Sequence, residues 1–596
     1  MGKPATRKRQ KEKAPARTVA VKGRGQKAQL RLFEEKEERD EAATRPAPAR
    51  PRAKAPSAAG PAQATSPAAA PPAPAASTRR RETAESLAAR QREISVSEFF
   101  TKNRHLLGFD NPAKALLTAI KEAVDNSLDA CEEAGILPRL EVVIREISED
   151  RFRVSVTDNG PGIVKAQIPR IFGKLLYGSK FHILKQSRGQ QGIGISAAGM
   201  YSQLTTGKPV RIVSRTGKGK PAHQYEIQID TAKNMPTTIS EGTADWPHDH
   251  GTSVEMELQA TYKKGRRSVD DYIAQTALAN PHAEILYTDP KGETFHHPRL
   301  TEELPREPVP IKPHPYGVEL GILIKMMKET RSRNLRGALQ ADFSRVSGKV
   351  ADEIARAAGI APEARPRQLS HDQIERLFKA VPTVRIMSPP TNCLSPIGDE
   401  LIRDGLTKMI PGCDFYTAVT RSPAVYRGNP FQIEAGLAYG GPLPADELTD
   451  LWRFANRVPL QYQQSACAIT RSVILNDWKH YGLAQPKGSL PTAPMVLFVH
   501  MASAWVPFTS ESKEAIASYP EIVKETRLAL QECGRRLGAF LRHRRREEDA
   551  EKKRSYIEKY IPHIGIALRE ILGFSAKDEA RVVETLKDTL ERSRTL

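Results

Sequence analysis

The feature that most constrains this chain is a helix whose start, end and two faces can be located in the sequence. It begins at Asp110-Asn111-Pro112, where a capping residue is followed by proline in the first turn, and it continues through Ala134 until Gly135 ends it. At 100° per residue, apolar side chains cover one broad arc, while Glu122, Asn126 and Asp129 fall within an arc of about 60° on the opposite side. The pattern predicts an amphipathic helix packed on a larger core.

The polar stripe on this helix has two explanations. Polar side chains at this spacing usually form the solvated face of an amphipathic helix. This stripe contains no Lys or Arg, although the chain has 91 of them, and it precedes glycine motifs suited to phosphate binding. A carboxylate and an amide one turn apart suit a metal–phosphate site, with Glu122 as a general base for water and Asn126 as an oxygen ligand for Mg²⁺.

A predicted hairpin follows the helix and ends in a glycine turn. Its first strand covers residues 140–147, and its second alternates Phe152, Val154 and Val156 before Asp158-Asn-Gly-Pro-Gly162. A carboxylate at a strand end can accept a hydrogen bond from the amino group of a base, and glycines let the backbone approach a ring closely. Such a segment is more often only a turn, and the motif alone does not decide between the two.

Two further glycine segments suit phosphate binding, namely Gly178-Ser179-Lys180 and residues 187–196 (Ser-Arg-Gly-Gln-Gln-Gly-Ile-Gly-Ile-Ser). Successive backbone N–H groups at a helix N-terminus can hold phosphate oxygens. Neither segment fits the better-known motifs. The first has Lys and Ser in the wrong order for a P-loop, and the second follows a polar stretch where a dinucleotide fingerprint requires a strand.

Positive charge is concentrated at the N-terminus. The formal net charge is +21, and residues 1–90 hold 21 Lys and Arg against nine Asp and Glu. This segment is rich in Pro and Ala and poor in large apolar residues, so we predict a disordered basic tail that attracts nucleic acid. The alternatives are a tail that only aids solubility and a transit peptide, which the acidic residues at 34–38 argue against.

The rest of the chain indicates a folded intracellular protein. No stretch of about 18 apolar residues is present, so no membrane span is expected, and 495–508 is predicted to be a buried strand. The five cysteines form no CxxC pair, which argues against a zinc or disulfide framework. Proline-rich breaks near 304–315 and 387–396 bound a block with helices predicted over 317–330, 335–359 and 370–381, and a long helix is predicted from about Ser510.

The acidic and glycine motifs occur together in an order that resembles the GHKL ATPase superfamily. The matching segments are 122–130 (Glu-Ala-Val-Asp-Asn-Ser-Leu-Asp-Ala), 158–162, 189–194 and 251–256 (Gly-Thr-Ser-Val-Glu-Met). A closer resemblance, over roughly residues 92–545, is to the B-subunit family of DNA topoisomerase VI. Segments that carry it include 98–113, 172–180 (Phe-Gly-Lys-Leu-Leu-Tyr-Gly-Ser-Lys), 341–351 and 477–481 (Asp-Trp-Lys-His-Tyr).

The resemblance implies an α/β (α+β) chain of several domains. We expect a disordered basic tail over 1–90, a GHKL (Bergerat) ATP-binding sandwich over 91–310, a helix-two-turn-helix domain over 311–385, a transducer domain of β-sheet with helices and a long C-terminal helix over 386–550, and a helical segment over 551–596 that docks an A subunit. The alternative for residues 551–596 is a helix that folds back on its own domain and binds no partner.

The resemblance also implies roles for individual residues. Glu122 activates the attacking water, Asn126 holds Mg²⁺ and Asp158 binds the adenine amino group. Lys479, in a Trp-Lys-x-Tyr element, reaches the γ-phosphate from the transducer; the alternative is a surface lysine beside core aromatic residues. Contacts with ATP are expected from these residues and from Gly162, Ser179, Lys180, Arg188, Gly189, Gln190, Gln191, Gly192, Ile193, Gly194 and Ile195.

The implied activity is that of the ATP-hydrolysing B subunit of a type IIB DNA topoisomerase, with ATP and Mg²⁺ as cofactors. Dimerisation of the ATPase domains, with exchange of the segment near Ile94–Phe100, is expected to gate passage of double-stranded DNA through a break made by an A subunit in an A2B2 heterotetramer. The sequence offers no convincing tyrosine nucleophile with clustered metal-binding acids, which fits cleavage by another chain. The basic residues 263–267 are candidates for DNA contact or for a solvated loop. A cytoplasmic, nucleoid-associated location is expected if the source is prokaryotic.

Three other functions are alternatives to that of a topoisomerase B subunit. The main alternative is a GHKL ATPase that clamps DNA without cleaving it. A histidine kinase is disfavoured because no helix with a phosphoacceptor histidine precedes the ATP motifs. A non-enzymatic DNA-binding scaffold is opposed by the presence of Glu122 and Lys479.

Overall fold

The computed structural model describes residues 84–91, 94–180, 183–189, 192–573 and 575–592. Of the tail predicted over 1–90, only 84–90 fall within this part, including the short helix α2 (Ala84–Ala88); the rest of that prediction lies outside the described residues. The chain divides into two compact units, Met1–Arg90 and Gln91–Leu596. All elements after α2 belong to the second unit.

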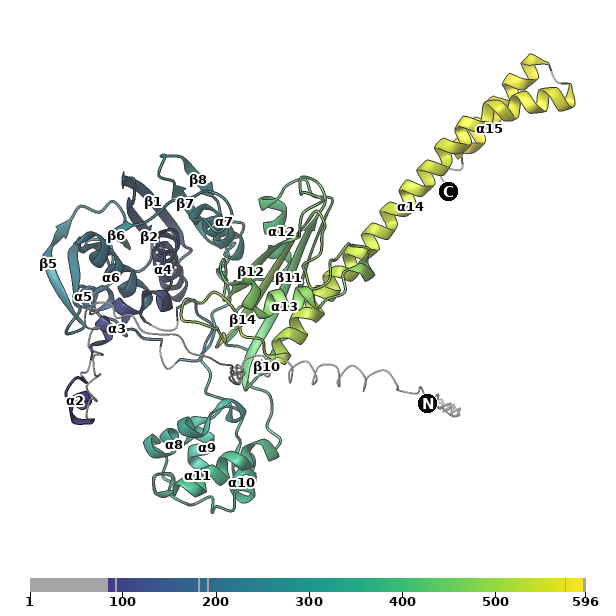
Figure 1. The fold of residues 1–596 in the computed structure, drawn as a ribbon. Helices are drawn as coiled ribbons and strands as arrows, with labels where there is room; N and C mark the ends of the chain where they lie inside the picture. The colour runs from purple at the N-terminus through teal and green to yellow at the C-terminus, as the bar shows by residue number, and fades with distance from the viewer. Residues whose placement is uncertain (1–83, 92–93, 181–182, 190–191, 574, 593–596) are drawn as a thin grey trace, which may run out of the picture. The chain divides into compact units, whose positions relative to one another are not determined.

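An eight-stranded sheet covered by helices forms the first part of this unit (Figure 1). The strand order is β5-β4-β3-β6-β2-β1-β7-β8, and every neighbouring pair is antiparallel except β1 with β7. The strands are β1 (Arg139–Ser148), β2 (Arg151–Asp158), β3 (Val210–Arg215), β4 (Ala222–Asp230), β5 (Met235–Ala244), β6 (Gly251–Gln259), β7 (Glu284–Thr288) and β8 (Thr294–His297). The helices are α3 (Val96–Lys102), α4 (Pro112–Glu133), α5 (Ile168–Gly173), α6 (Gly194–Thr206) and α7 (Val269–Ala279), with 3-10 turns η1 (Arg104–Leu107) and η2 (Lys165–Gln167).

Helix α4 begins and ends where the sequence predicts. The Asn111 side chain caps it by accepting a hydrogen bond from the Lys114 N–H at 2.9 Å, and Pro112 is its first residue. It ends at Glu133, and Gly135 then adopts a φ of 70°, which glycine tolerates. The apolar side chains of α4 belong to the main hydrophobic core, so the helix fixes the position of its polar residues firmly.

Strand β2 explains why a carboxylate is buried at its end. Its residues alternate between partly buried and buried positions, as period-two patterning predicts. The buried face carries Phe152, Val154, Val156 and Asp158. Asp158 therefore lies on the face of the sheet that packs against the helices.

A helical block with its own apolar core follows the first sheet (Figure 1). Its helices are α8 (Leu320–Glu329), α9 (Leu335–Asp342), α10 (Gly348–Ala357) and α11 (His371–Ala380), with turns η3 (Pro315–Gly317), η4 (Pro366–Gln368) and η5 (Val381–Thr383). The prediction of one continuous helix over 335–359 is wrong, because the structure has two helices there, α9 and α10, with a break between them. The break between α9 and α10 occurs because Arg345 adopts a left-handed φ of 61° and Ser347 caps the new helix.

A second, six-stranded sheet has the order β10-β11-β14-β12-β13, with β9 paired to β11. The strands are β9 (Phe415–Thr420), β10 (Ala424–Tyr426), β11 (Asn429–Tyr439), β12 (Asp450–Ala455), β13 (Val458–Pro459) and β14 (Met495–Ser503), and the helices are α12 (Asp399–Met409) and α13 (Ala468–Ile474), with turns η6 (Gln464–Ala466) and η7 (Lys479–Tyr481). All nine residues of β14 are buried, which confirms the buried strand predicted there.

The C-terminal helix α14 (Pro520–Leu572) packs its first turns on the second sheet, and α15 (Ala576–Arg592) packs on its far end (Figure 1). The predicted start near Ser510 is wrong by ten residues. Residues before Pro520 instead form a loop in which Lys513 has a left-handed φ of 53° and Phe508 pairs with Ile516. Within the described residues no helix combines the length and apolar character that a membrane crossing needs.

Candidate functional site

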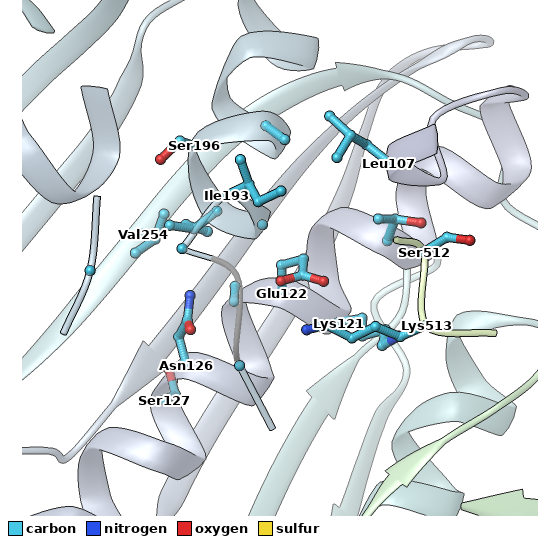
Figure 2. Close-up of a pocket in the computed structure, with 18 of the residues that line it drawn as sticks. Leu107, Lys121, Glu122, Asn126, Ser127, Ile193, Ser196, Val254, Ser512 and Lys513 are labelled. Carbon is cyan, nitrogen blue, oxygen red and sulfur yellow. The ribbon is translucent and has the colours of Figure 1, made fainter. Parts of the chain in front are cut away.

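A cavity of about 310 Å³ opens beside the polar side of α4, and Figure 2 shows the residues around it. Its volume lies at the lower end of the range typical of small-molecule sites. Its wall includes residues of α4, the end of β2, the start of α6, residues 177–180, and two segments near the second sheet, 459–462 and 511–514. The cavity thus brings together segments from the two sheets, which have separate hydrophobic cores.

Glu122 and Asn126 both line this cavity. Glu122 is half-buried and Asn126 is exposed to the opening, whereas Asp129, one turn further on, is only 6% exposed and pairs with cations. Asp129 is therefore not part of a solvated helix face, whereas Glu122 and Asn126 face the cavity. Figure 2 shows Glu122 between the start of α6 and the loop at Ser512.

Gly194 lets the start of α6 approach the Glu122 carboxylate. A Cβ atom added at Gly194 would lie 1.6 Å from Glu122 Oε2, so no other residue fits there without moving Glu122. The backbone N–H groups at the start of α6 can bind an anion, as helix N-termini do. Gly189, Gly192, Ile193 and Ile195 also line the cavity, while the predicted contacts Gln190 and Gln191 lie outside the described residues.

Asp158 lines the cavity from the end of β2 and is held by three hydrogen bonds. Its Oδ2 accepts from Ser127 Oγ at 2.8 Å, and its Oδ1 accepts from the N–H groups of Gly160 at 2.9 Å and Thr252 at 3.2 Å. Burial raises the pKa of Asp158, although these hydrogen bonds favour its charged form. A fixed, buried carboxylate of this kind can select a ligand that offers an amino group.

Gly162 shapes the turn after Asp158 but does not line the cavity. It adopts a φ of 72°, and a Cβ there would lie 2.0 Å from the carbonyl oxygen of Arg215 on β3. Glycine is required at this position for both reasons. The predicted role of Gly162 as a ligand contact is therefore replaced by a role in the turn that carries Asp158.

Ser179 and Lys180 also line the cavity. Lys180 Nζ pairs with Asp129 Oδ2 at 2.6 Å, so the side chain is already directed toward α4. Asp129 and Glu133 raise the pKa of Lys180 against the opposing effect of its burial. Lys180 is therefore charged and available to exchange Asp129 for an anion such as a phosphate.

Arg188 differs from its predicted position. It is buried and is not among the residues that line the cavity, because its guanidinium turns toward Asp129 at 2.8 Å and Glu132 at 2.6 Å. Burial opposes the charge on Glu132, but Arg188 and His282 outweigh it and hold the pKa of Glu132 below its usual range. Arg188 thus ties residues 187–189 to α4 rather than facing the cavity.

The structure does not bring Lys479 to the cavity. Lys479 begins η7 with an exposed side chain, next to the buried Trp478. The lysine that the same part of the chain contributes to the cavity is Lys513, which is 8% exposed and donates a hydrogen bond from Nζ to the carbonyl oxygen of Arg188 at 3.2 Å. No local motif indicated Lys513, because its surroundings were assigned to the start of a long helix.

A second lysine that the sequence motifs did not indicate, Lys121, also lines the cavity. Figure 2 shows it beside Glu122, and it is close enough to Lys513 for the two charges to interact. Burial lowers the pKa of Lys121, while Asp125 and Glu122 act in the opposite direction. Glu122 therefore lies at the cavity together with two lysines, Lys121 and Lys513.

The oxygen donors of the cavity fit a magnesium ion that is bound mainly by the phosphates of a nucleotide and by water, with few protein ligands. In the part of the chain that the structure describes, no three His, Cys, Asp or Glu side chains are grouped as a metal ion would need. The Asn126 amide and the Glu122 carboxylate are the amide and carboxylate oxygens that α4 contributes to the cavity, beside the hydroxyl groups of Thr118 and Ser127. Mg²⁺ is commonly bound by one or two protein oxygens together with substrate phosphates and water.

Comparisons with known proteins show similarity to ATPases over the segment that contains α4 and to a transducer family over the second sheet. Residues 111–259 match the family described as "Histidine kinase-, DNA gyrase B-, and HSP90-like ATPase", and residues 389–553 match "Topoisomerase VI B subunit, transducer". The B subunit of type 2 DNA topoisomerase 6 from Methanococcoides burtonii is 49% identical over 498 residues, which cover 83% of this chain and 80% of that protein. The protein of the same name from Archaeoglobus fulgidus is 47% identical, over 84% of this chain and 83% of that protein. The one from Pyrococcus horikoshii is 38% identical, over 80% of this chain and 92% of that protein.

Proposed function

The chain belongs to the family of type 2 DNA topoisomerase 6 B subunits, and from this premise we propose how its cavity works. It is the ATP-binding and ATP-hydrolysing subunit of a DNA topoisomerase. The observation that supports this proposal is that Glu122, Asn126, Asp158 and Lys513 all line one cavity, with Lys513 contributed by the loop before α14.

The proposed hydrolysis uses this chain's residues as follows. Asp158 accepts a hydrogen bond from the adenine amino group, and the start of α6 with Ser179 and Lys180 binds the phosphates. Asn126 holds Mg²⁺, which neutralises phosphate charge when bound. Glu122 accepts a proton from the water that attacks the γ-phosphate, and general-base catalysis of this type contributes about 10²–10⁴-fold.

Lys513, rather than Lys479, is proposed as the lysine that contacts the γ-phosphate. A flexible stem with a compact charge suits a residue that must reach a phosphate from a neighbouring domain. The proposal is supported by the position of Lys513 at the cavity and by the exposed position of Lys479 away from it. ATP would then be bound more tightly when the two parts of the chain are closed together, which is the condition for ATP to drive closure.

The domain boundaries at 91–310, 311–385 and 386–550 remain proposals. They are supported by separate hydrophobic clusters, one around α4 and the first sheet, one within α8 to α11, and one around β11, β14 and α14. The first is the ATPase domain, the second the helix-two-turn-helix domain and the third the transducer. The segment 551–596 is the remaining helical part.

The proposed partners are double-stranded DNA, a second copy of this chain and an A subunit that cleaves DNA. Exchange of residues 94–100 between two copies is the proposed dimer contact. Docking of the A subunit on 551–596 is supported by exposed apolar side chains on α14, which are Tyr556, Ile557, Tyr560, Ile564, Ile566, Ile571 and Leu572. Within the basic cluster at 263–267, Lys264 pairs with Asp289 and Glu293, so its availability to DNA depends on breaking these pairs.

The proposal is tested by separating ATP binding from ATP hydrolysis. Glu122→Gln should bind ATP with nearly unchanged affinity but lose turnover by about 10²–10⁴-fold, because it removes the proton acceptor and keeps the shape. Glu141→Gln, an exposed carboxylate on β1, is the matched control and should leave both unchanged. Turnover of Glu122→Gln close to that of the unaltered chain would remove Glu122 as the base.

A further inference from the structure

The hairpin that joins β12 to β13 has an unusual tip. Its two central residues, Asn456 and Arg457, have φ angles of 48° and 67°, and Ala455 pairs with Val458 on either side of them. Turns of this kind favour asparagine followed by glycine. An arginine in the second position is strained, and residues held in such conformations persist only when their surroundings enforce them.

Asn456 connects this tip to the loop that precedes α6. Its Nδ2 donates to the carbonyl oxygen of Ser187 at 2.9 Å and to that of Ser503, at the end of β14, at 3.0 Å. Its Oδ1 accepts from the Ser503 N–H at 2.8 Å. One buried side chain therefore links the base of the phosphate-binding loop to the central strand of the transducer sheet.

Arg457 connects the tip to three other segments. Its guanidinium donates to the carbonyl oxygen of Pro396 at 2.9 Å, just before α12, and its backbone N–H donates to His500 Nε2 at 2.9 Å. Its carbonyl oxygen accepts from Asn280 Nδ2 at 3.3 Å, at the end of α7. The guanidinium contact with Pro396 is the one that requires arginine, because the other two use backbone atoms that glycine would also supply.

A continuous series of polar contacts runs from the cavity to this tip. Lys180 pairs with Asp129, which pairs with Arg188, and Arg188 donates to Asn280, whose amide donates to Arg457. Lys180 is the member that faces the cavity. An anion that takes Lys180 from Asp129 changes the charge balance around Arg188, at the base of the loop.

We propose that Asn456 and Arg457 are positioning residues that couple phosphate binding at the loop before α6 to the conformation of the transducer sheet. This inference rests on the proposed function, because it takes ATP phosphates as the anion that Lys180 meets. A ligand shifts a conformational equilibrium only through contacts that differ between the states, and the exchange of Asp129 for phosphate by Lys180 is such a difference. The tip is distinct from Lys513, which reaches the cavity directly.

Hydrogen–deuterium exchange of the purified chain, with and without a non-hydrolysable ATP analogue and Mg²⁺, tests this role. The variants are Asn456→Gly and Arg457→Gly, which remove the side-chain contacts while glycine suits the left-handed turn. Arg427→Gly is the matched control, because Arg427 also has a left-handed φ of 42° in a transducer hairpin, where it lies over the Tyr519 ring. Equal melting temperatures establish that the variants fold.

In the unaltered chain and in Arg427→Gly, the analogue should slow exchange in α4 and also in residues 395–409, which lead into and form α12. In both tip variants the slowing in α4 should remain, and the slowing in 395–409 should fall by roughly tenfold, a typical coupling between sites. A full response of 395–409 in both tip variants would overturn the inference. No slowing in α4 of the unaltered chain would instead contradict ATP binding at the cavity, so the two failures are distinguishable.

Discussion

Lys513 Nζ donates a hydrogen bond to the carbonyl oxygen of Arg188 at 3.2 Å, although the two residues are 325 positions apart in the sequence. Arg188 belongs to the loop before α6, and Lys513 belongs to the loop before α14. The bond places the ammonium group of Lys513 beside the segment that leads to α6. The cavity proposed to bind ATP therefore includes residues near both β-sheets, such as Glu122 and Lys513.

The first prediction compares the two candidate lysines. Lys513→Ala should lower ATP turnover by about 10- to 100-fold, because a charge-assisted hydrogen bond to a phosphate contributes roughly 1.5–3 kcal/mol. Lys479→Ala should leave turnover by the isolated chain within about twofold, since its side chain is exposed away from the cavity. Steady-state ATP hydrolysis measures both, and the opposite ranking would restore Lys479 as the γ-phosphate contact.

The second prediction concerns adenine selection. Asp158→Asn should weaken ATP binding by about 10- to 100-fold, because a charged acceptor held by Ser127, Gly160 and Thr252 is replaced by a neutral amide. Asp150→Asn, an exposed carboxylate beside the same sheet, serves as the control. Calorimetric titration with a non-hydrolysable ATP analogue measures the affinities. Unchanged binding by Asp158→Asn would exclude Asp158 as the adenine acceptor.

The third prediction concerns the contact between α6 and the catalytic carboxylate. Gly194→Ala should reduce turnover by more than about tenfold, since the added Cβ would lie 1.6 Å from Glu122 Oε2 and force the carboxylate to move. Gly242→Ala is the matched control, because a Cβ there meets nothing within 4 Å. Hydrolysis rates of the two variants are compared at saturating ATP. Equal rates would show that Glu122 can move without loss.

The fourth prediction concerns the effect of pH on transducer stability. His500 Nε2 accepts a hydrogen bond from the Arg457 N–H, so this nitrogen carries no proton, and burial lowers the pKa of His500. Below the unfolded pKa of about 6.5 the unfolded chain therefore binds a proton that the folded chain does not, and stability falls by up to about 1.4 kcal/mol per pH unit. Burial opposes the charge on Glu434, but His500 and the N–H groups of Ile397 and Gly398 lower its pKa, so stability falls further below about pH 4.5.

Urea unfolding followed by the fluorescence of the buried Trp478 measures this dependence between pH 7.5 and about 5. His500→Gln should flatten it, because glutamine does not titrate. His543→Gln, at an exposed position on α14, should keep the slope of the unaltered chain. Identical slopes for all three proteins would contradict a neutral buried His500.

Much of the first domain could be predicted from local patterns. The start of α4 follows from Asn111 and Pro112, which act within one turn, and the alternation along β2 places Asp158 on the buried face. The resemblance to GHKL ATPases then supplied Glu122, Asn126 and Asp158, which the structure brings to one cavity. These residues could be predicted because each belongs to a motif that is continuous in the sequence.

Other parts of the site depend on contacts between distant segments. Arg188 was predicted to contact ATP, but its guanidinium forms ion pairs with Asp129 and Glu132 and does not line the cavity. No motif pointed to Lys513, since its loop was predicted to be the start of a long helix, whereas its left-handed φ and the pairing of Phe508 with Ile516 place it in a loop before α14. Similarly, the break at Arg345 follows from a backbone conformation that residue preferences do not reveal.

The central claim is tested most directly by relaxation of supercoiled plasmid DNA. The chain is purified from its native source with whatever second protein stays bound, and the linking number is followed with ATP and Mg²⁺. Stepwise relaxation that requires ATP, and that disappears when Glu122→Gln replaces the unaltered chain, is the predicted result. A complex that hydrolyses ATP and binds DNA but leaves the linking number unchanged would contradict the claim and favour a clamp without cleavage.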